Sequence, residues 1–211
     1  MTIGYFVAKI CKKQAKYKMS LHNNLREIEK YNPNLVKRLS RYQFSEDAKL
    51  EFFQTHSNHT SLFYNGIALH SEINPEEEAL TVLKTIPSKS ANTVIILFGL
   101  GVGYFFKELY DGTKSKIVIF EPNMDILRLT MEAVDFSKEL SDKRVRIANT
   151  FEELTDSITS LYSYNDTVLT TMLPSANVLY SSEIARLKEE FSQILNLLQS
   201  NLTTLFFHTF G

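Results

Sequence analysis

Three glycines and one acid are the residues of this sequence best suited to chemistry. Gly99, Gly101 and Gly103 follow an apolar run, and Glu121 lies 20 residues after Gly101 at the end of a second run. Glycines let the backbone approach a ligand closely, and the helix after them offers unpaired N–H groups to an anion. An acid at this place could accept hydrogen bonds from both hydroxyls of a ribose. Together with Asn123, these residues form the candidate ligand-binding site.

The glycine turn departs from two cofactor-binding motifs. A dinucleotide motif has its third glycine where this chain has Tyr104, and a methyltransferase motif has an acid where this chain has Leu97. Without that acid, the expected contact to the methionine part of S-adenosylmethionine is missing. Two interpretations stay open: a nucleotide-type ligand binds here, or the glycines only allow a tight turn and close packing. We prefer the second, because a fold does not establish a function, and we assign no cofactor.

The pattern around the glycines predicts the elements that position them. Buried runs alternate with helical patterns from residue 94 to residue 171. Such alternation indicates right-handed crossovers and a parallel sheet with helices on both faces. We therefore predict an α/β fold with a Rossmann-like (methyltransferase-like) doubly wound parallel sheet. The expected strands are 94–98, 117–121, 144–148 and 167–171, and the expected helices are 103–110, 123–134 and 151–162.

The residues before this sheet predict a small helical and hairpin module. Residues 1–49 carry eleven Lys/Arg and four Asp/Glu, which suggests either a separate module or a solvated helix face. Asn32-Pro33 and Asn74-Pro75 are typical of helix starts, and Asn65-Gly66 is typical of a hairpin turn. We expect four parts: a basic helical N-terminal module at 1–57, a hairpin plus linking helix at 58–90, the Rossmann-like domain at 91–180, and a long amphipathic helix at 181–211 leading to a downstream domain.

Composition and charge exclude several classes of function. A net charge of −1 gives no general attraction to nucleic acid or to a membrane, so neither is expected as a partner. Cys11 is the single cysteine, so no internal disulfide forms, and no apolar run reaches the roughly 20 residues of a membrane span. His56 and His59 show no metal-ligand spacing with carboxylates, so no metal is expected. These features predict a cytoplasmic protein.

Two stretches resemble the N-terminal region of bacterial motility accessory factors (Maf proteins). The first reads Tyr64-Asn65-Gly66-Ile67-Ala68-Leu69-His70-Ser71, followed by Asn74-Pro75 and Glu78-Ala79. The second joins Phe98-Gly99-Leu100-Gly101-Val102-Gly103-Tyr104 to Ile119-Phe120-Glu121-Pro122-Asn123. The glycine motif alone is shared by many Rossmann-like proteins, whereas the combination and its order are more specific. The resemblance covers about residues 55–211.

The resemblance implies a multi-domain cytoplasmic protein that takes part in adding nonulosonic acids, such as pseudaminic or legionaminic acid, to Ser/Thr of flagellin. It places the catalytic centre in a sialyltransferase-like domain after Gly211, an expectation that agrees with the apolar pattern from Ile184 to Phe210. The present residues would then be non-catalytic. They would bind flagellin, the downstream domain, a second copy or a nucleotide-type ligand. The alternatives are an S-adenosylmethionine-dependent methyltransferase that uses Gly99–Gly103 and Glu121, and a helix-mediated interaction module without a ligand.

Overall fold

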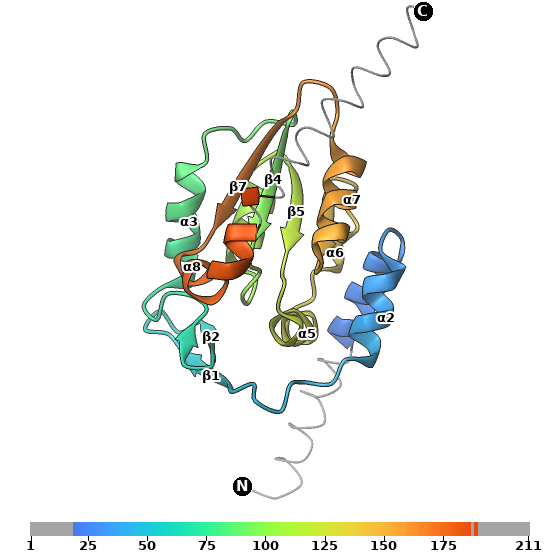
Figure 1. The fold of residues 1–211 in the computed structure, drawn as a ribbon. Helices are drawn as coiled ribbons and strands as arrows, with labels where there is room; N and C mark the ends of the chain where they lie inside the picture. The colour runs from blue at the N-terminus through green and yellow to red at the C-terminus, as the bar shows by residue number, and fades with distance from the viewer. Residues whose placement is uncertain (1–18, 187, 190–211) are drawn as a thin grey trace, which may run out of the picture.

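A computed structural model describes residues 19–186 and 188–189 of the chain. Its centre is a four-stranded sheet with helices on both faces (Figure 1). No helix among the described residues is long and apolar enough to cross a membrane. The strands of this sheet, in spatial order, are β6 Val145–Ala148, β5 Lys116–Phe120, β4 Thr93–Phe98 and β7 Thr167–Met172. The helices around them include α3 Pro75–Thr85, α4 Tyr104–Gly112, α5 Met124–Ala133, α6 Ser137–Leu140 and α7 Phe151–Leu161.

The direction in which strands are added reverses at β4. The chain passes from β4 to β5 and β6 on one side, and then returns to place β7 on the other side of β4. Each of the three strand pairs is parallel. This arrangement confirms the predicted Rossmann-like fold, with strands and helices close to the expected bounds. In such a sheet, ligands bind beyond the carboxyl ends of the strands at the point of reversal.

Alternate side chains of β4 build two hydrophobic cores. Ile95 and Leu97 belong to a cluster that includes residues of α3 and α4, which we call the first core. Val94, Ile96 and Phe98 belong to a cluster that includes residues of α7, which we call the second core. Every residue of β4 is buried, as expected for an inner strand covered on both faces. Full burial of one such side chain contributes roughly 1.5–3 kcal/mol, so packing holds β4 and the turn after it firmly in place.

The N-terminal helices pack on the first core. Residues 19–29 are helical, and α2 spans Pro33–Arg41 with Asn32 as its N-cap, as the sequence predicts. The Asn24 side chain donates to two carbonyl oxygens near the end of α5, at 2.9 and 2.7 Å. The buried side chains that join these helices to the first core are Ile28, Leu35 and Leu39.

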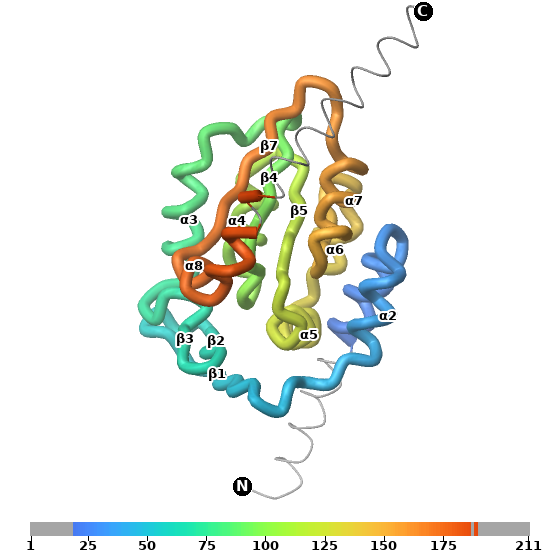
Figure 2. The backbone as a smooth tube through the Cα atoms, viewed as in Figure 1, coloured from blue at the N-terminus to red at the C-terminus, as the bar shows by residue number. Residues whose placement is uncertain are grey.

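A linker leads from α2 past α5 to a small antiparallel sheet (Figure 2). Its strands are β1 Leu50–Gln54, β2 Thr60–Tyr64 and β3 Ile67–Ala68. The hairpin turn is confirmed, because Asn65 and Gly66 have φ angles of 50° and 81°. Strand β1 was missing from the prediction, which placed residues 50–54 in a helical module. These residues are extended because their backbone pairs with the whole of β2, a tertiary contact that local spacing does not reveal.

Two short helices and an interruption of helical geometry were also absent from the prediction. These helices are α6 and α8, and α8 spans Pro174–Leu179 directly after β7. The chain leaves helical geometry at Tyr180, with φ −124° and ψ 35°, and residues 181–186 are helical again. Ile184 packs on the second core. The remainder of the predicted apolar stripe, Leu187 and the residues beyond 189, lies outside the described residues.

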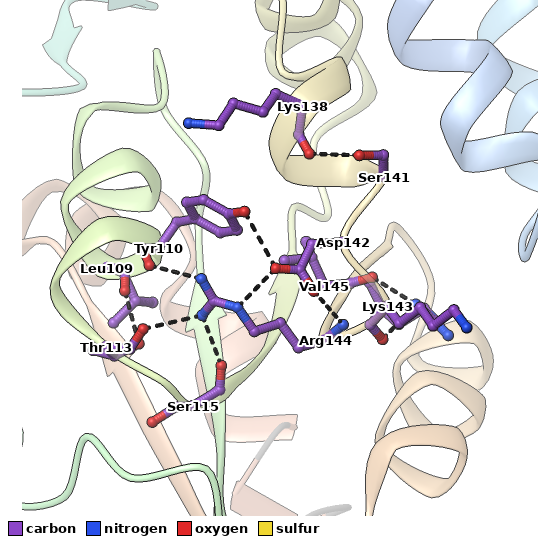
Figure 3. Close-up of polar contacts among 11 residues, drawn as sticks. Leu109, Tyr110, Thr113, Ser115, Lys138, Ser141, Asp142, Lys143, Arg144 and Val145 are labelled. Atoms are coloured by element: carbon purple, nitrogen blue, oxygen red, sulfur yellow. Dashed lines mark hydrogen bonds and ion pairs between the residues drawn. The ribbon is translucent and has the colours of Figure 1, made fainter.

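Arg144 joins the elements at the amino ends of β5 and β6 (Figure 3). Its guanidinium donates to the carbonyl oxygens of Tyr110 (2.8 Å), Thr113 (3.2 Å) and Ser115 (3.0 Å) and to the carboxylate of Asp142 (2.9 Å). It also lies 4.2 Å from the centre of the Tyr110 ring. A cation at the end of α4 is favourable for the helix dipole. This end of the sheet is therefore tied together by structural contacts.

Candidate functional site

Three glycines in the left-handed region form the turn after β4. The φ angle is +83° at Gly99, +55° at Gly101 and +91° at Gly103, values that residues with a side chain seldom adopt. Gly103 is also the N-cap residue of α4. The turn therefore has the place and the backbone form that the sequence predicts for a ligand-binding turn. Its role depends on what its N–H groups contact.

Glu121, at the end of β5, is fully buried and uses both carboxylate oxygens within the chain. Its Oε2 accepts the N–H of Leu100 (2.8 Å), and its Oε1 accepts the N–H of Asn123 (3.0 Å) and the hydroxyl of Tyr180 (2.5 Å). Burial raises the pKa of Glu121, while these hydrogen bonds act in the opposite direction. The carboxylate thus binds groups of its own chain, including the glycine turn, where the sequence pattern led us to expect ribose hydroxyls.

Helix α8 and Tyr180 fill the crevice at the point of strand reversal. A Cβ added to Gly99 would lie 3.2 Å from the Cβ of Ala176 and 3.5 Å from Cε2 of Tyr180. The Ser175 hydroxyl donates to the carbonyl oxygen of Leu69 (2.7 Å), which ties α8 to the segment after the hairpin. The cavity left here has a volume of about 10 Å³, at the lower limit for one water molecule. This conformation has no room for a nucleotide in the crevice.

His70 occupies the outer side of the glycine turn. The N–H of Val102 donates to Nε2 of His70 (2.7 Å), and a Cβ at Gly101 would lie 2.5 Å from the same nitrogen. Because Nε2 accepts this bond, the ring proton of neutral His70 is on Nδ1. Burial lowers the pKa of His70 to about 3, so the ring stays neutral. Its Nδ1 lies 3.9 Å from Oε2 of Glu78 and has no hydrogen-bond partner among the described residues.

Gly103 and Gly101 make further contacts within the chain. Gly103 is packed against Phe136, because an added Cβ would lie 2.2 Å from Cζ of that ring. The Thr130 hydroxyl donates to the carbonyl oxygen of Gly101 (2.6 Å). The Asn123 side chain caps α5 by accepting the N–H groups of the second and third residues after it, at 2.9 and 3.1 Å. The amide side chain is thus occupied as a helix cap.

The structure brings all five predicted site residues together and adds two that the sequence did not indicate. Gly99, Gly101, Gly103, Glu121 and Asn123 lie around one turn, as expected. His70 and Tyr180 complete this turn, but they lie 31 residues before and 79 residues after Gly101. No spacing in the sequence could link them to it. The two departures from cofactor motifs are structural: Leu97 faces the first core, and the Tyr104 hydroxyl donates to the carbonyl oxygen of Thr60 (2.9 Å).

A larger cavity lies away from this turn, between the start of α2 and one side of α7. Its volume is about 430 Å³. Arg38 lines it and pairs with Glu153 (2.7 Å), while Arg146 lies over the Tyr31 ring at 4.7 Å. Its walls are mostly polar, and its residues belong to the contact between the N-terminal helices and the sheet. The wall residues are Tyr31, Asn32, Pro33, Asn34, Arg38, Arg146, Thr150, Glu152, Glu153, Asp156, Ser157 and Ser160.

Known structures resemble this fold at low sequence identity. The structure of a Maf glycosyltransferase from Magnetospirillum magneticum AMB-1 matches with a TM-score of 0.55 and 13% identity, over 84% of this chain and 35% of that chain. The present chain therefore spans about a third of that protein. Phosphoethanolamine N-methyltransferase 2 from Haemonchus contortus, in complex with phosphomonomethylethanolamine and S-adenosylhomocysteine, matches with a TM-score of 0.34 and 13% identity over 65% of this chain and 41% of that chain. A TM-score this low carries no argument about function.

The sequence itself matches a family model. No curated protein matches the chain. The model described as the glycosyltransferase Maf N-terminal domain matches residues 51–198, which is more than half of the chain. The match includes the hairpin, the glycine turn and the whole parallel sheet, the same stretches that carry the resemblance seen in the sequence. The chain belongs to the glycosyltransferase Maf N-terminal domain family.

Proposed function

We propose that these residues form a non-catalytic N-terminal domain of a Maf glycosyltransferase that acts on flagellin, and that the glycine turn is the centre of its scaffold. The acceptor would be Ser/Thr of flagellin and the donated group a nonulosonic acid, as the family resemblance implies. One observation carries the non-catalytic part of the proposal. The place where a Rossmann-like fold holds a nucleotide is filled by side chains of this chain, with Glu121 satisfied by Leu100, Asn123 and Tyr180.

Opening the site for a nucleotide would break several contacts at once. Tyr180 and α8 would leave Gly99, and His70 would leave the N–H of Val102. Each lost hydrogen bond to a buried polar group costs about 1–3 kcal/mol when its partner stays buried and unpaired. A ligand would have to make up this free energy before it gained affinity, because every 1.4 kcal/mol reduces affinity about tenfold. The filled turn therefore supports a scaffold role.

A scaffold domain acts through its surfaces. We expect its partners to be the downstream part of the same polypeptide, flagellin and, in an oligomer, a second copy. The compact packing around β4 and the hydrogen bonds that Glu121, His70 and Thr130 make to the turn agree with a domain that presents surfaces and does no chemistry. Cytoplasmic location follows from the same proposal, since flagellin would be modified before its export.

Ligand-induced stabilisation of the complete polypeptide tests the absence of a nucleotide site. We expect S-adenosylmethionine, NAD and ATP at millimolar concentration to leave the melting temperature of this domain unchanged. A ligand at 100 times its Kd would stabilise the folded state by about 2.7 kcal/mol, which is readily measured. If S-adenosylmethionine raises the melting temperature and Glu121→Ala removes that increase, the methyltransferase alternative replaces our proposal.

The glycosyltransferase part has its own test. The complete protein and flagellin are produced together, and the mass of flagellin is measured by mass spectrometry. We expect added masses that correspond to nonulosonic acids on Ser or Thr peptides. Unmodified flagellin in the presence of a nonulosonic acid donor would contradict the proposed activity, whether or not the glycine turn binds a ligand.

A further inference from the structure

The two edges of the parallel sheet differ in how their backbone groups are paired. The edge strand β6 has four residues, one of them Arg146. The edge strand β7 has six residues, none of them charged or proline, and four of them are β-branched. Natural proteins protect exposed edges by short strands, charges, prolines or covering segments. On these criteria β6 is a protected edge, whereas nothing in the described part of the chain protects β7.

Three outward backbone groups of β6 have partners within the described chain. The N–H of Val145 donates to the carbonyl oxygen of Asp142 (3.0 Å), and its own carbonyl oxygen accepts from Nη1 of Arg146 (2.7 Å). The carbonyl oxygen of Ile147 accepts from the Asn32 side chain (3.4 Å). A turn, an arginine and the cap residue of α2 thus close this edge against further strands.

The outward groups of β7 have no such partners among residues 19–186 and 188–189. The N–H of Thr167 donates to the carbonyl oxygen of Asn92 (3.0 Å). The backbone N–H and C=O groups of Thr167 therefore point toward β4. Because successive residues of a strand point to opposite sides, Val168, Thr170 and Met172 direct their N–H and C=O groups away from β4. None of these groups is hydrogen-bonded to another described residue. The edge is therefore ready to pair with another strand.

The faces on which the crossovers lie indicate where that strand comes from. The connection from β4 to β5 packs on the first core through α4, and the connection from β6 to β7 packs on the second core through α7. These opposite faces follow from right-handed crossovers in opposite directions. One further parallel strand beyond β7 would need a helix on the same face as α7. Residues 181–186 are helical on that face, because Ile184 packs on the second core and Arg186 lies 4.3 Å from the centre of the Phe151 ring.

We propose that the free edge of β7 pairs with a parallel strand from the part of the same polypeptide C-terminal to residue 189, which extends the described four-stranded sheet. The chain spans 35% of the Maf glycosyltransferase that it resembles, so a relative of that length has ample polypeptide to supply the strand. This inference deepens the proposed contact with the downstream part of the protein. It is independent of whether the glycine turn binds a ligand, because its test measures backbone pairing at β7.

Hydrogen exchange of the complete polypeptide, resolved to single amides, tests the proposal. The amides of Val168, Thr170 and Met172 should exchange about as slowly as those of Leu169 and Thr171, which face β4. Exchange at the three outward amides that is at least about 100-fold faster than at these neighbours would overturn it. Protection that is lost when the protein is diluted to a monomer would also overturn it, because a second copy would then cover the edge.

A pair of variants in the complete polypeptide gives a second measurement. Thr170→Pro removes an outward N–H, and Thr170→Val keeps that N–H and the β-branched shape. Proline is tolerated at an edge whose N–H faces solvent, but it removes a ladder hydrogen bond inside a sheet. We expect Thr170→Pro to melt at least about 4 °C below Thr170→Val. Equal melting temperatures would show an open edge and contradict the proposal.

Discussion

The hydroxyl of Tyr180 donates to Oε1 of Glu121 over 2.5 Å, and this pair closes the crevice at the point of strand reversal. Burial raises the pKa of Tyr180, and the nearby Glu121 carboxylate raises it further. The phenol therefore keeps its proton and remains the donor. Tyr180, which follows β7 and α8, therefore contacts the acid at the end of β5. The contact replaces an expected ligand by a bond within the chain.

Tyr180→Phe should destabilise the domain by about 1.5–3 kcal/mol, because hydrogen bonds to charged groups are worth more than neutral ones. The phenyl ring keeps the packing against Gly99, so the change reports on the hydroxyl. Denaturant unfolding monitored by circular dichroism measures the free energy of unfolding. Tyr164→Phe, at a side chain that is 70% exposed, is the matched control and should change it by less than about 0.5 kcal/mol. A Tyr180→Phe variant as stable as this control would show that Glu121 does not depend on the hydroxyl.

The buried His70 should make the domain sensitive to mild acid. Its pKa is lowered by burial from 6.5 to about 3, so the unfolded chain binds a proton that the folded chain excludes. The stability contributed by neutral His70 is therefore present above pH 6.5 and is lost as the pH falls toward 3. Between pH 6.5 and 4.5 the loss approaches roughly 2.7 kcal/mol, at 1.36 kcal/mol per pH unit. Unfolding free energies measured across this range check the slope.

His70→Gln separates this titration from the hydrogen bond. The Gln side-chain oxygen can accept the N–H of Val102 in place of Nε2, and the side chain does not titrate. We expect a flatter dependence of stability on pH between 6.5 and 4.5. The control is His22→Gln, at an exposed position on the helix at residues 19–29, which should keep the wild-type slope. Equal slopes for wild type and His70→Gln would mean that His70 does not titrate as its burial requires.

The sequence predicts the sheet well, because its signals are local. Apolar runs mark all four parallel strands, and capping residues such as Asn32, Asn74 and Asn123 mark helix starts that the structure reproduces. In a Rossmann-like fold the turn after the first strand lies beside the end of the next strand, so the sequence also places the glycine turn next to Glu121. Strand β1 depends on pairing with β2, and charged residues around it hide its character. Local sequence signals therefore predict the elements that do not depend on one particular tertiary contact.

The occupants of the site could not be predicted in the same way. His70 follows the hairpin and Tyr180 follows α8, and each reaches the glycine turn only after the whole sheet has formed. The mismatch at Leu97 and Tyr104 showed that a cofactor motif was incomplete, but it did not show what fills the space. That information depends on packing across more than thirty residues of sequence in each direction. Only three-dimensional contacts reveal that the turn binds its own chain.

Arg144→Lys should destabilise the domain by about 1–3 kcal/mol. Lysine keeps the charge, but it cannot reach the carbonyl oxygens of Tyr110, Thr113 and Ser115 together, because only the planar guanidinium has donors in this arrangement. Partly buried carbonyl groups that lose their donor carry the cost. Lys143→Ala, next to it and exposed, is the control and should be nearly neutral. Thermal unfolding of both variants tests the assignment, and equal melting temperatures would contradict it.

Two glycines with positive φ angles allow backbone strain to be distinguished from a steric clash. Gly66 and Gly101 have φ angles of +81° and +55°, so alanine is strained at both. Nothing lies within 4 Å of a Cβ at Gly66, whereas a Cβ at Gly101 would lie 2.5 Å from Nε2 of His70. Gly66→Ala should therefore cost about 1–2 kcal/mol, the usual strain of a left-handed residue. Gly101→Ala should cost a further 1–3 kcal/mol, roughly the penalty of overpacking.

The collision at Gly101 can be relieved by its partner. In the His70→Ala background the imidazole is absent, so Gly101→Ala should cost about as much as Gly66→Ala. A double-mutant cycle of unfolding free energies measures this coupling, which should be at least about 1 kcal/mol for residues in contact. Additive costs would mean that the imidazole moves aside freely. The glycine at position 101 would then not be required by His70, and the turn would be open to a ligand on that side.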